Sequence, residues 1–398
     1  MSAEWQSMPL GDAVTFQRGF DLPAQDRVAG GVPIVSSSGV SGRHSKAAAK
    51  GPGVVTGRCG TIGQVFYIDE DYWPLNTTLW VKDFHGNHVR FMSYMLRTVD
   101  YWSCSDKSSV PGVNRNDLHR LPIRLPPLPE QRAIASVLGA LDDKIDLNRR
   151  MCQTLEEMAR ALFKSWFVDF DPVRAKMEGR DPGLPKEIAD LFPSRLVESA
   201  LGPIPEGWRA AVLGEVVENY DAKRVPLSSR ERAERRGPFP YYGAASVMDH
   251  VDDFLFDGTY VLMGEDGSVV NQDGAPVLQY VWGKFWVNNH AHVLRGANGV
   301  GTEQLLLHLK GAKVAPFVTG AVQPKLNQGN MNRIPFVQPP EPVSRAFGQT
   351  IEPMFAGVRT KTDQSQTLTA LRDTLLPKLI SGELRVPASL GTMQEVAS

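Results

Sequence analysis

Two stretches of this chain carry the same apolar repeat, and this repeat most constrains what the chain can fold into. Within residues 134–162 and 347–375, positions recur at alternating intervals of four and three residues. This spacing is typical of a helix that lies along another helix. The candidate seam positions are Ile134, Leu138, Leu141, Ile145, Asn148, Leu155 and Leu162 in the first stretch, and Ile351, Met354, Val358, Lys361, Leu368 and Leu375 in the second. A helix of about 31 residues spans about 46 Å, so each stretch predicts a rod.

The two rods belong to a tandem repeat that covers most of the chain. Trp5 matches Trp208 at an offset of 203 residues, and Gly60 matches Gly267 at an offset of 207. From Pro111 and Pro324 onward the offset is 213. The shared residues are mainly Trp, Gly, Pro and Asn, while most residues between them differ. The sequence therefore predicts one fold used twice with different surfaces. Two unrelated core helices are the alternative, but they do not explain the match in the segments before each helix.

The predicted fold class is α+β, with two mixed α/β domains joined by two long antiparallel coiled-coil helices. Short β-branched and aromatic runs broken by Gly and Asn are typical of strands and turns. Proline-rich runs precede both rods and favour a stiff hinge at each start. The predicted boundaries are residues 1–129 for the first domain, 130–170 for the first helix, 171–207 for a linker, 208–342 for the second domain, 343–385 for the second helix and 386–398 for a tail.

Each rod has a polar residue at the middle of its seam. If a two-fold axis relates the repeats, the rods run antiparallel and their midpoints meet, which predicts that Asn148 and Lys361 lie close together. The alternative is that both side chains face solvent on exposed turns. The pair Asp142–Asp143 is expected on the outer face of the first rod, as solvated charges.

Composition restricts the class of protein. Apolar residues make up 42% of the chain, and no apolar run is long enough to span a membrane. Cys59, Cys104 and Cys152 are far apart and lack ligand-like spacing, so we expect free thiols in a reducing compartment. The N-terminal residues lack the basic and apolar regions of a signal peptide. These features predict a cytoplasmic protein that does not enter the membrane.

Motifs for catalysis are not found in the sequence. It contains neither a phosphate-binding Gly-rich loop nor a dinucleotide-binding glycine pattern, nor an Asn/Asp-Pro-Pro-aromatic motif. His290 and His292 could suggest a metal, but no Cys or acidic residue keeps a ligand spacing, so ordinary hydrogen bonding at a strand end is favoured. The sequence predicts a recognition or scaffold protein with no catalytic residue and no metal site.

Four segments carry a resemblance to a known family. They are residues 127–135, which begin Pro-Leu-Pro-Glu-Gln, residues 163–173, residues 204–208 and residues 375–384. Together with the order of the parts over the whole chain, these segments resemble the specificity subunits of Type I restriction–modification systems. One departure is that the Glu130–Gln131 pair is not repeated at the start of the second rod, which is expected to weaken one symmetric contact.

The resemblance implies two target-recognition domains, each reading one half of a bipartite site in double-stranded DNA. The rods would act as a ruler, and about 46 Å exceeds one DNA turn of about 34 Å. The resemblance also implies two modification subunits that dock on the rods and carry S-adenosylmethionine for adenine methylation. Restriction subunits with ATP and Mg²⁺ would complete the assembly, and no cofactor is expected in this chain.

Candidate DNA contacts are basic, amide and aromatic residues in loop-like stretches. Arg and Asn suit base edges, Lys suits phosphate, and Tyr can stack. The candidates are Arg43, His44, Lys46, Arg58, Lys107, Asn114 and Arg115 in the first domain, and Lys223, Arg224, Tyr241, Tyr242, Lys284, Lys325 and Asn327 in the second. Each charged candidate could instead be a solvated surface residue. Asn114 and Asn327 could mark a shared turn, and the two tyrosines could fill a core.

The charge balance argues against strong DNA binding by this chain alone. Residues 1–129 contain 13 Lys and Arg against 11 Asp and Glu, and residues 208–340 contain 13 of each. Because phosphate contacts supply most non-specific affinity, we expect the modification subunits to supply much of the grip on DNA. The alternatives are a duplicated protein-binding scaffold without DNA specificity, and an enzyme with an unrecognised site.

Overall fold

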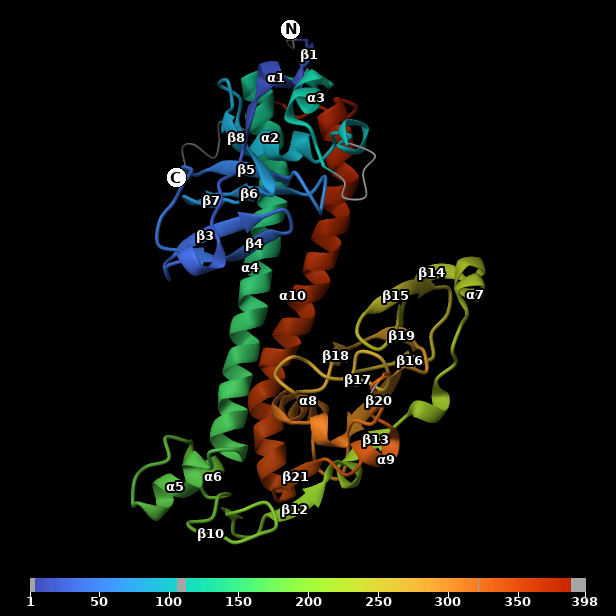
Figure 1. Ribbon diagram of the computed structural model, residues 1–398. Coiled ribbons are helices and arrows are strands. Elements are labelled where there is room, and N and C mark those ends of the chain that lie inside the picture. Colours follow the sequence, from blue (N-terminus) through green and yellow to red (C-terminus); the bar gives the residue numbers. More distant parts are fainter. Residues whose placement is uncertain (1–3, 106–111, 321, 388–398) are drawn as a thin grey trace. The chain divides into compact units, whose positions relative to one another are not determined.

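The structure is a computed structural model that describes residues 4–105, 112–320 and 322–387. It divides into two compact units, which are described separately (Figure 1). The first unit comprises residues 1–148 and 364–398, and the second comprises residues 149–363. The candidate Lys107 lies outside the described residues.

The first unit contains a four-stranded sheet of order β2-β8-β5-β6, a three-stranded sheet of order β4-β3-β7, and the antiparallel pair β1-β9. Its elements are β1 (Gln6–Pro9), α1 (Leu10–Ala13), β2 (Thr15–Arg18), η1 (Ala24–Asp26), β3 (Val32–Ser36), β4 (Gly39–His44), β5 (Gly53–Gly57), β6 (Val65–Ile68), β7 (Trp73–Pro74), β8 (Thr78–Asp83), α2 (Val89–Leu96), η2 (Trp102–Cys104), α3 (Arg115–Arg120) and β9 (Pro122–Leu125). Helix α2 begins where the His88 ring accepts a hydrogen bond from the Phe91 N–H. It buries Phe91 and Leu96 in the same apolar cluster as Ile134 of the first long helix.

The second unit repeats this plan with sheets of order β13-β20-β17-β18 and β15-β14-β19-β16, and with the antiparallel pair β12-β21. Its elements are β12 (Arg209–Val212), η3 (Leu213–Glu215), β13 (Val217–Asn219), η4 (Asp221–Lys223), α7 (Ser229–Glu234), β14 (Arg236–Tyr242), β15 (Val247–Val251), β16 (Phe256–Asp257), β17 (Tyr260–Gly264), β18 (Leu278–Val281), β19 (Lys284–Val287), β20 (Ala291–Gly296), α8 (Thr302–Gly311), η5 (Ala315–Phe317), α9 (Gln328–Met331) and β21 (Pro335–Gln338). Helix α8 buries Leu305 and Leu309 in one cluster with Val261 of β17 and Phe347 of the second long helix.

Strand registers show that the two units share one fold. Met8 pairs with Ile123 in the first unit, and Ala211 pairs with Phe336 in the second. The differences between these positions are 203 and 213 residues, the same offsets that relate the two halves of the sequence. The tandem repeat predicted from sequence is therefore confirmed strand by strand.

The two longest elements are the helices α4 (Leu128–Phe167) and α10 (Glu341–Ser381), which pack together and contribute to both units (Figure 1). In the first unit, Asp142 of α4 meets Arg372 of α10 at 2.8 Å, and Asn148 donates to the Ser365 hydroxyl at 3.4 Å. Positions increase along α4 while they decrease along α10, so the helices run antiparallel. The predicted fold class is confirmed.

The predicted seam faces inward along both helices. Ile134, Leu138, Asn148, Ile351 and Val358 are buried, and the remaining seam positions are partly buried. At the predicted polar midpoint of α4, Asn148 donates a hydrogen bond to the Ser365 hydroxyl at 3.4 Å. Ser365 follows Lys361 by four residues, about one helical turn. The closeness of Asn148 and Lys361 themselves stays a prediction.

The prediction that Asp142 and Asp143 are solvated was wrong for Asp142, whereas the Asp143 side chain is 65% exposed. The Asp142 side chain is only 18% exposed, and it accepts a hydrogen bond from the Tyr94 hydroxyl at 2.7 Å besides its pairing with Arg372. Asp143 pairs with Arg90, which also comes from α2. Heptad spacing did not reveal that α2 packs across this side of α4.

Residues 171–207 are a folded part of the second unit. They form α5 (Asp171–Met177), α6 (Lys186–Ala189), β10 (Leu196–Val197) and β11 (Ile204–Pro205). Phe192 is 2% exposed, and its ring lies 5.1 Å from the Trp166 ring and 6.3 Å from the Trp208 ring. Aromatic packing of this kind holds the segment against the end of α4.

The Glu130–Gln131 departure between the repeats has a structural counterpart. In the first unit, Glu130 is 8% exposed and accepts a hydrogen bond from the Trp5 indole at 3.1 Å. The equivalent indole of Trp208 has no hydrogen-bond partner among the described residues.

No helix in the described part of the chain is both long and apolar enough to cross a membrane.

Candidate nucleic-acid interface

A cavity rich in arginine lies at the edge of the four-stranded sheet of the first unit. Arg18 is the last residue of β2, Arg58 follows β5, and Arg115 opens α3. Together with Asn114 and Asn116 they line a cavity of about 460 Å³, which has Leu79 and Val113 on its apolar side. We call it the arginine cavity. Three candidate residues from the sequence, Arg58, Asn114 and Arg115, are thus brought together.

Backbone contacts hold these side chains in place. The Val113 N–H donates to the Arg58 carbonyl oxygen at 2.8 Å, and Cys59 and Gly112 form an isolated antiparallel β-bridge. The loop after β5 therefore lies against the segment that precedes α3. The Asn114 side chain accepts a hydrogen bond from the Asn116 N–H at 2.9 Å and caps α3. The interpretation of Asn114 as a turn residue is therefore confirmed.

The arginine cavity carries uncompensated positive charge. Among the described residues, none of its three guanidinium groups has a carboxylate within 4.0 Å. The Arg58 side chain donates one hydrogen bond at 3.4 Å to the Asn76 carbonyl oxygen. Guanidinium groups present a planar fork of donors that matches phosphate oxygens, so the cavity is chemically suited to an anion.

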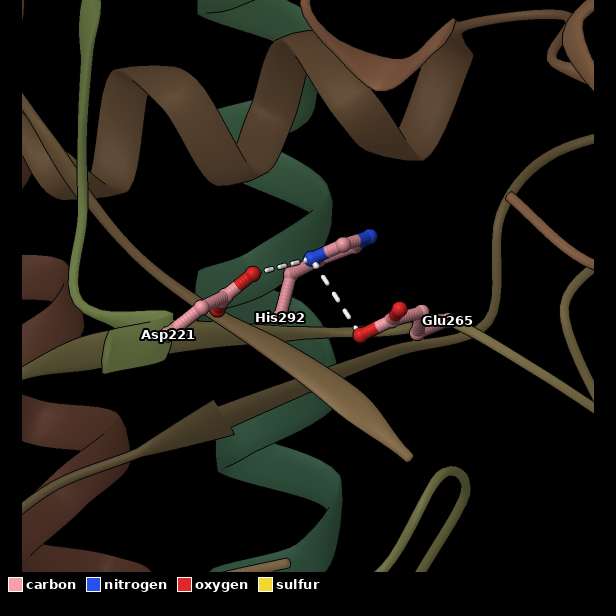
Figure 2. A group of neighbouring side chains, drawn as sticks. All are labelled: Asp221, Glu265 and His292. Atoms are coloured by element: carbon pink, nitrogen blue, oxygen red, sulfur yellow. Dashed lines mark hydrogen bonds and ion pairs between the residues drawn. The ribbon is translucent and has the colours of Figure 1, made fainter. Parts of the chain in front are cut away.

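An ionic network stands at the edge of the corresponding sheet in the second unit. Figure 2 shows Asp221, Glu265 and His292 pointing toward one another from η4, the loop after β17, and β20. The His292 Nδ1 atom lies 2.5 Å from Asp221 and 3.8 Å from Glu265. Two cations complete what we call the ionic network. Arg224 lies 2.8 Å from Glu265 and 3.4 Å from Asp221, and Lys325 lies 3.4 Å from Glu265.

Most of the network is buried. The side chains of His292, Asp221, Arg224 and Glu265 are 0%, 10%, 13% and 14% exposed. Burial alone raises the pKa of Asp221, but the hydrogen bond and charge of His292, the Val293 N–H and Arg224 outweigh it and hold the pKa below its usual value. The Asp221 carboxylate is therefore stabilised in its charged form by the groups around it.

Asp221, Glu265 and His292 also have the geometry of a possible metal-ligand group, because their ligand atoms lie within 4.8 Å of one another. The bonding of His292 opposes this role. Its Nδ1 faces the Asp221 carboxylate at 2.5 Å and its Nε2 lies 2.8 Å from the Leu326 carbonyl oxygen, so each ring nitrogen already contacts an oxygen of the protein. A metal would have to displace one of these contacts, and Arg224 adds positive charge between the carboxylates.

The side chains of three candidate DNA contacts make their contacts inside the protein. His44 is 5% exposed and accepts a hydrogen bond from the Val28 N–H at 3.0 Å. Tyr241 is 1% exposed and its hydroxyl accepts from the Leu227 N–H at 2.9 Å. Arg224 belongs to the ionic network. Tyr242 is partly buried, with its ring 5.7 Å from that of Phe285.

The remaining candidates lie on the surface of their units. Arg43 is exposed and lies 3.7 Å from Glu70, Lys46 and Lys223 are exposed, and Lys284 lies over the Phe254 ring at 4.5 Å. Asn327 caps α9 by accepting a hydrogen bond from the Asn330 N–H at 2.9 Å, as Asn114 caps α3. Their contact with DNA stays a prediction.

Sequence reasoning missed Arg18, Asn116, Asp221 and Glu265. Arg18 is the last residue of β2 and Asp221 is the first residue of η4, and neither belongs to a recognised motif. The one signal that could have found them is the repeat itself, because an offset of 203 residues places Arg18 opposite Asp221 and an offset of 207 places Arg58 opposite Glu265.

Comparisons with known proteins agree with the duplicated fold. The family described as the Type I restriction modification DNA specificity domain matches residues 2–157 and 205–369. The Type I restriction enzyme HindI specificity subunit of Haemophilus influenzae is 23% identical, covering 96% of this chain and 100% of that protein. The MjaIX specificity subunit of Methanocaldococcus jannaschii is 26% identical, covering 71% of this chain and 65% of that protein. The crystal structure of a Type I restriction–modification S subunit from M. genitalium shares the fold, with a TM-score of 0.61, 16% identity and coverage of 94% and 96%.

A duplicated α/β domain with paired long helices, matched by the family over most of its length, defines the class of this protein. The chain belongs to the family of Type I restriction–modification DNA specificity domains. This confirms the predicted resemblance and the prediction of a recognition component rather than an enzyme.

Proposed function

We propose that this chain is the DNA sequence-recognition subunit of a cytoplasmic Type I restriction–modification complex. Each of its two domains reads one half of a bipartite site in double-stranded DNA, while α4 and α10 set the spacing between the halves. The observation that carries the proposal is that one strand register supports two different surfaces, an arginine cavity in one unit and an ionic network in the other. A duplicated fold with divergent surfaces suits the reading of two different half-sites.

The chemistry then belongs to partner subunits. Two modification subunits bring S-adenosylmethionine and methylate adenine, and restriction subunits bring ATP and Mg²⁺. The curated relatives are named as specificity subunits of Type I restriction enzymes, which supports such an assembly for this chain.

The first test is the pattern of adenine methylation on random DNA when the chain is co-expressed with its modification subunit. We expect a two-part motif with a fixed gap. Exchange of residues 208–342 for the matching domain of a related specificity subunit should change one half of the motif and leave the other half and the gap unchanged. A continuous motif would mean that one domain is silent. Absence of methylation with an active partner would favour the protein-scaffold alternative.

A second prediction concerns docking of the modification subunits on α4. Met151 and Met158 are 38% and 48% exposed, and their separation of seven residues places them on one face of the helix. Exposed apolar side chains of this kind suit a protein interface. We expect that Met151→Asp or Met158→Asp weakens binding of the modification subunit at least about tenfold, because each places an unpaired carboxylate in an apolar contact. Binding can be measured by calorimetry with the purified full chain.

The matched control is Gln153→Asp, which adds the same charge two residues away on a different side of the same helix. All three side chains are exposed, so the free energy of unfolding of the isolated chain should change by less than about 0.5 kcal/mol in each variant. Equal loss of binding in the control would assign the effect to net charge and would contradict the proposed docking face.

A further inference from the structure

The arginine cavity and the ionic network occupy the same place in the two repeats. Thr56 pairs with Leu79 in the first unit, and Met263 pairs with His292 in the second, at offsets of 207 and 213 residues. The next contacts repeat as well. The Val113 N–H donates to the Arg58 carbonyl oxygen, and the Leu326 N–H donates to the Glu265 carbonyl oxygen, both at 2.8 Å.

The strand on the other side gives the third correspondence. Phe16 pairs with Val81 in the first unit, and Asn219 pairs with Leu294 in the second, again at offsets of 203 and 213 residues. Arg18 lies two residues after Phe16, and Asp221 lies two residues after Asn219, so Arg18 and Asp221 occupy equivalent positions in the two repeats. Three backbone relations therefore map Arg18 onto Asp221, Arg58 onto Glu265, and Leu79 onto His292.

Charge is reversed between these equivalent places. The first unit has two guanidinium groups where the second has two carboxylates, and an apolar Leu79 where the second has a His292 ring that bonds on both sides. In the second unit the carboxylates lie against the cations Arg224 and Lys325 and against the His292 ring. In the first unit no carboxylate of the described residues lies within 4.0 Å of Arg18, Arg58 or Arg115.

We propose that the arginine cavity binds a phosphate group of the DNA backbone, and that the second unit makes no equivalent contact because Asp221 and Glu265 supply the negative charge there. This inference rests on the proposed function and adds that the two domains differ in the charge that they present at equivalent positions. The first domain holds one phosphate through several guanidinium groups, and the second domain depends on other contacts. The cavity of about 460 Å³ has room for a phosphate group and water.

The test measures salt dependence of DNA binding by the full chain in complex with its modification subunits. A protein that loses one phosphate contact loses about 0.9 from the slope of log K against log salt concentration. We expect this loss for Arg58→Gln and for Arg18→Gln. The double variant should lose no more than either single variant, because the two side chains share one phosphate. Arg58→Lys keeps the charge and should retain most of the slope.

Two controls give the proposal its specificity. The sequence suggested Lys325 as a DNA contact, but Lys325 lies 3.4 Å from Glu265 in the ionic network. The proposal therefore assigns Lys325 to charge compensation inside the protein, and Lys325→Gln should leave the slope unchanged. The methylated motif of Arg58→Gln should also be unchanged, because a phosphate contact positions DNA and carries no sequence information. A thermal melt of each variant shows whether it is folded, and only folded variants enter the comparison.

Each contrary result overturns a stated part. A folded Arg58→Gln variant with the wild-type slope would contradict the proposed phosphate contact. A methylated motif altered at one base would show that the cavity reads a base. A loss of slope in Lys325→Gln equal to that in Arg58→Gln would remove the asymmetry. Stabilisation of the wild type by inorganic phosphate but not of Arg58→Gln, with both slopes equal, would make the cavity a site for free phosphate. Failure of the proposed function is separate, because it is seen as a wild type without a bipartite methylation motif.

Discussion

Replacing Phe347 by alanine is expected to destabilise the second unit by about 3–5 kcal/mol. Phe347 is fully buried, and its ring lies 4.8 Å from that of Phe167, 5.5 Å from Trp166 and 6.0 Å from Phe163. It joins the start of α10 to the end of α4, so truncation would leave a cavity between two helices that are both tied to the domain core. The free energy of unfolding of the second unit can be measured by urea titration of the full chain, followed by tryptophan fluorescence.

The matched control for this cluster is Met177→Ala. Met177 lies on α5 in the same unit and is 51% exposed, so its truncation should change the free energy of unfolding by less than about 0.5 kcal/mol. Equal effects of the two substitutions would mean that the aromatic cluster is not the core that joins the helices.

Asp221→Asn is the second substitution with a large expected effect, a loss of about 3 kcal/mol or more from the stability of the second unit. The change removes the carboxylate that faces His292 at 2.5 Å and Arg224 at 3.4 Å, and it leaves buried cations without their partner. Hydrogen exchange in β13 and β20 should quicken, because Asp221 also accepts from the Val293 N–H at 2.9 Å. Urea titration gives the magnitude.

The dependence on pH identifies the cause. The pKa of Asp221 is held below its unfolded value of about 4, so its contribution to stability is complete above about pH 4. The contribution is lost as the pH falls further, through the folded-state pKa. The difference in stability between wild type and Asp221→Asn should therefore be constant near neutral pH and shrink below about pH 4. A difference that did not shrink would point to lost packing instead of lost charge.

Asp266→Asn is the neighbouring control. Asp266 also faces a histidine at 2.5 Å, but the His290 side chain is 46% exposed, and exposed ion pairs contribute about 0–1 kcal/mol. The contrast between the two Asp–His pairs separates the effect of burial from that of the pair itself. A loss at Asp266 as large as that at Asp221 would contradict the role assigned to burial.

The sequence was most informative where a pattern repeats. Heptad spacing located the inward faces of α4 and α10, since most seam positions are apolar whatever their partners are. The pairs Trp5 and Trp208, and Asn114 and Asn327, marked the repeat because turns and caps depend on the residue type itself. The sequence did not show that His44 and Tyr241 are buried, because their partners Val28 and Leu227 lie 16 and 14 residues away along the chain.

What the sequence determined by itself is the duplication, the α+β class and the long helices, because these follow from local periodicity and from matches at a fixed offset. The family was indicated separately, by the resemblance of four segments. What only the tertiary structure decided is which charges meet. Arg18, Arg58 and Arg115 come from three separate segments and form one cavity, while Asp221, Glu265 and His292 come from three others and form a closed network. The energy of a charge depends on its nearest opposite charge and on its burial, and both are set by strand register over distances that no local pattern records.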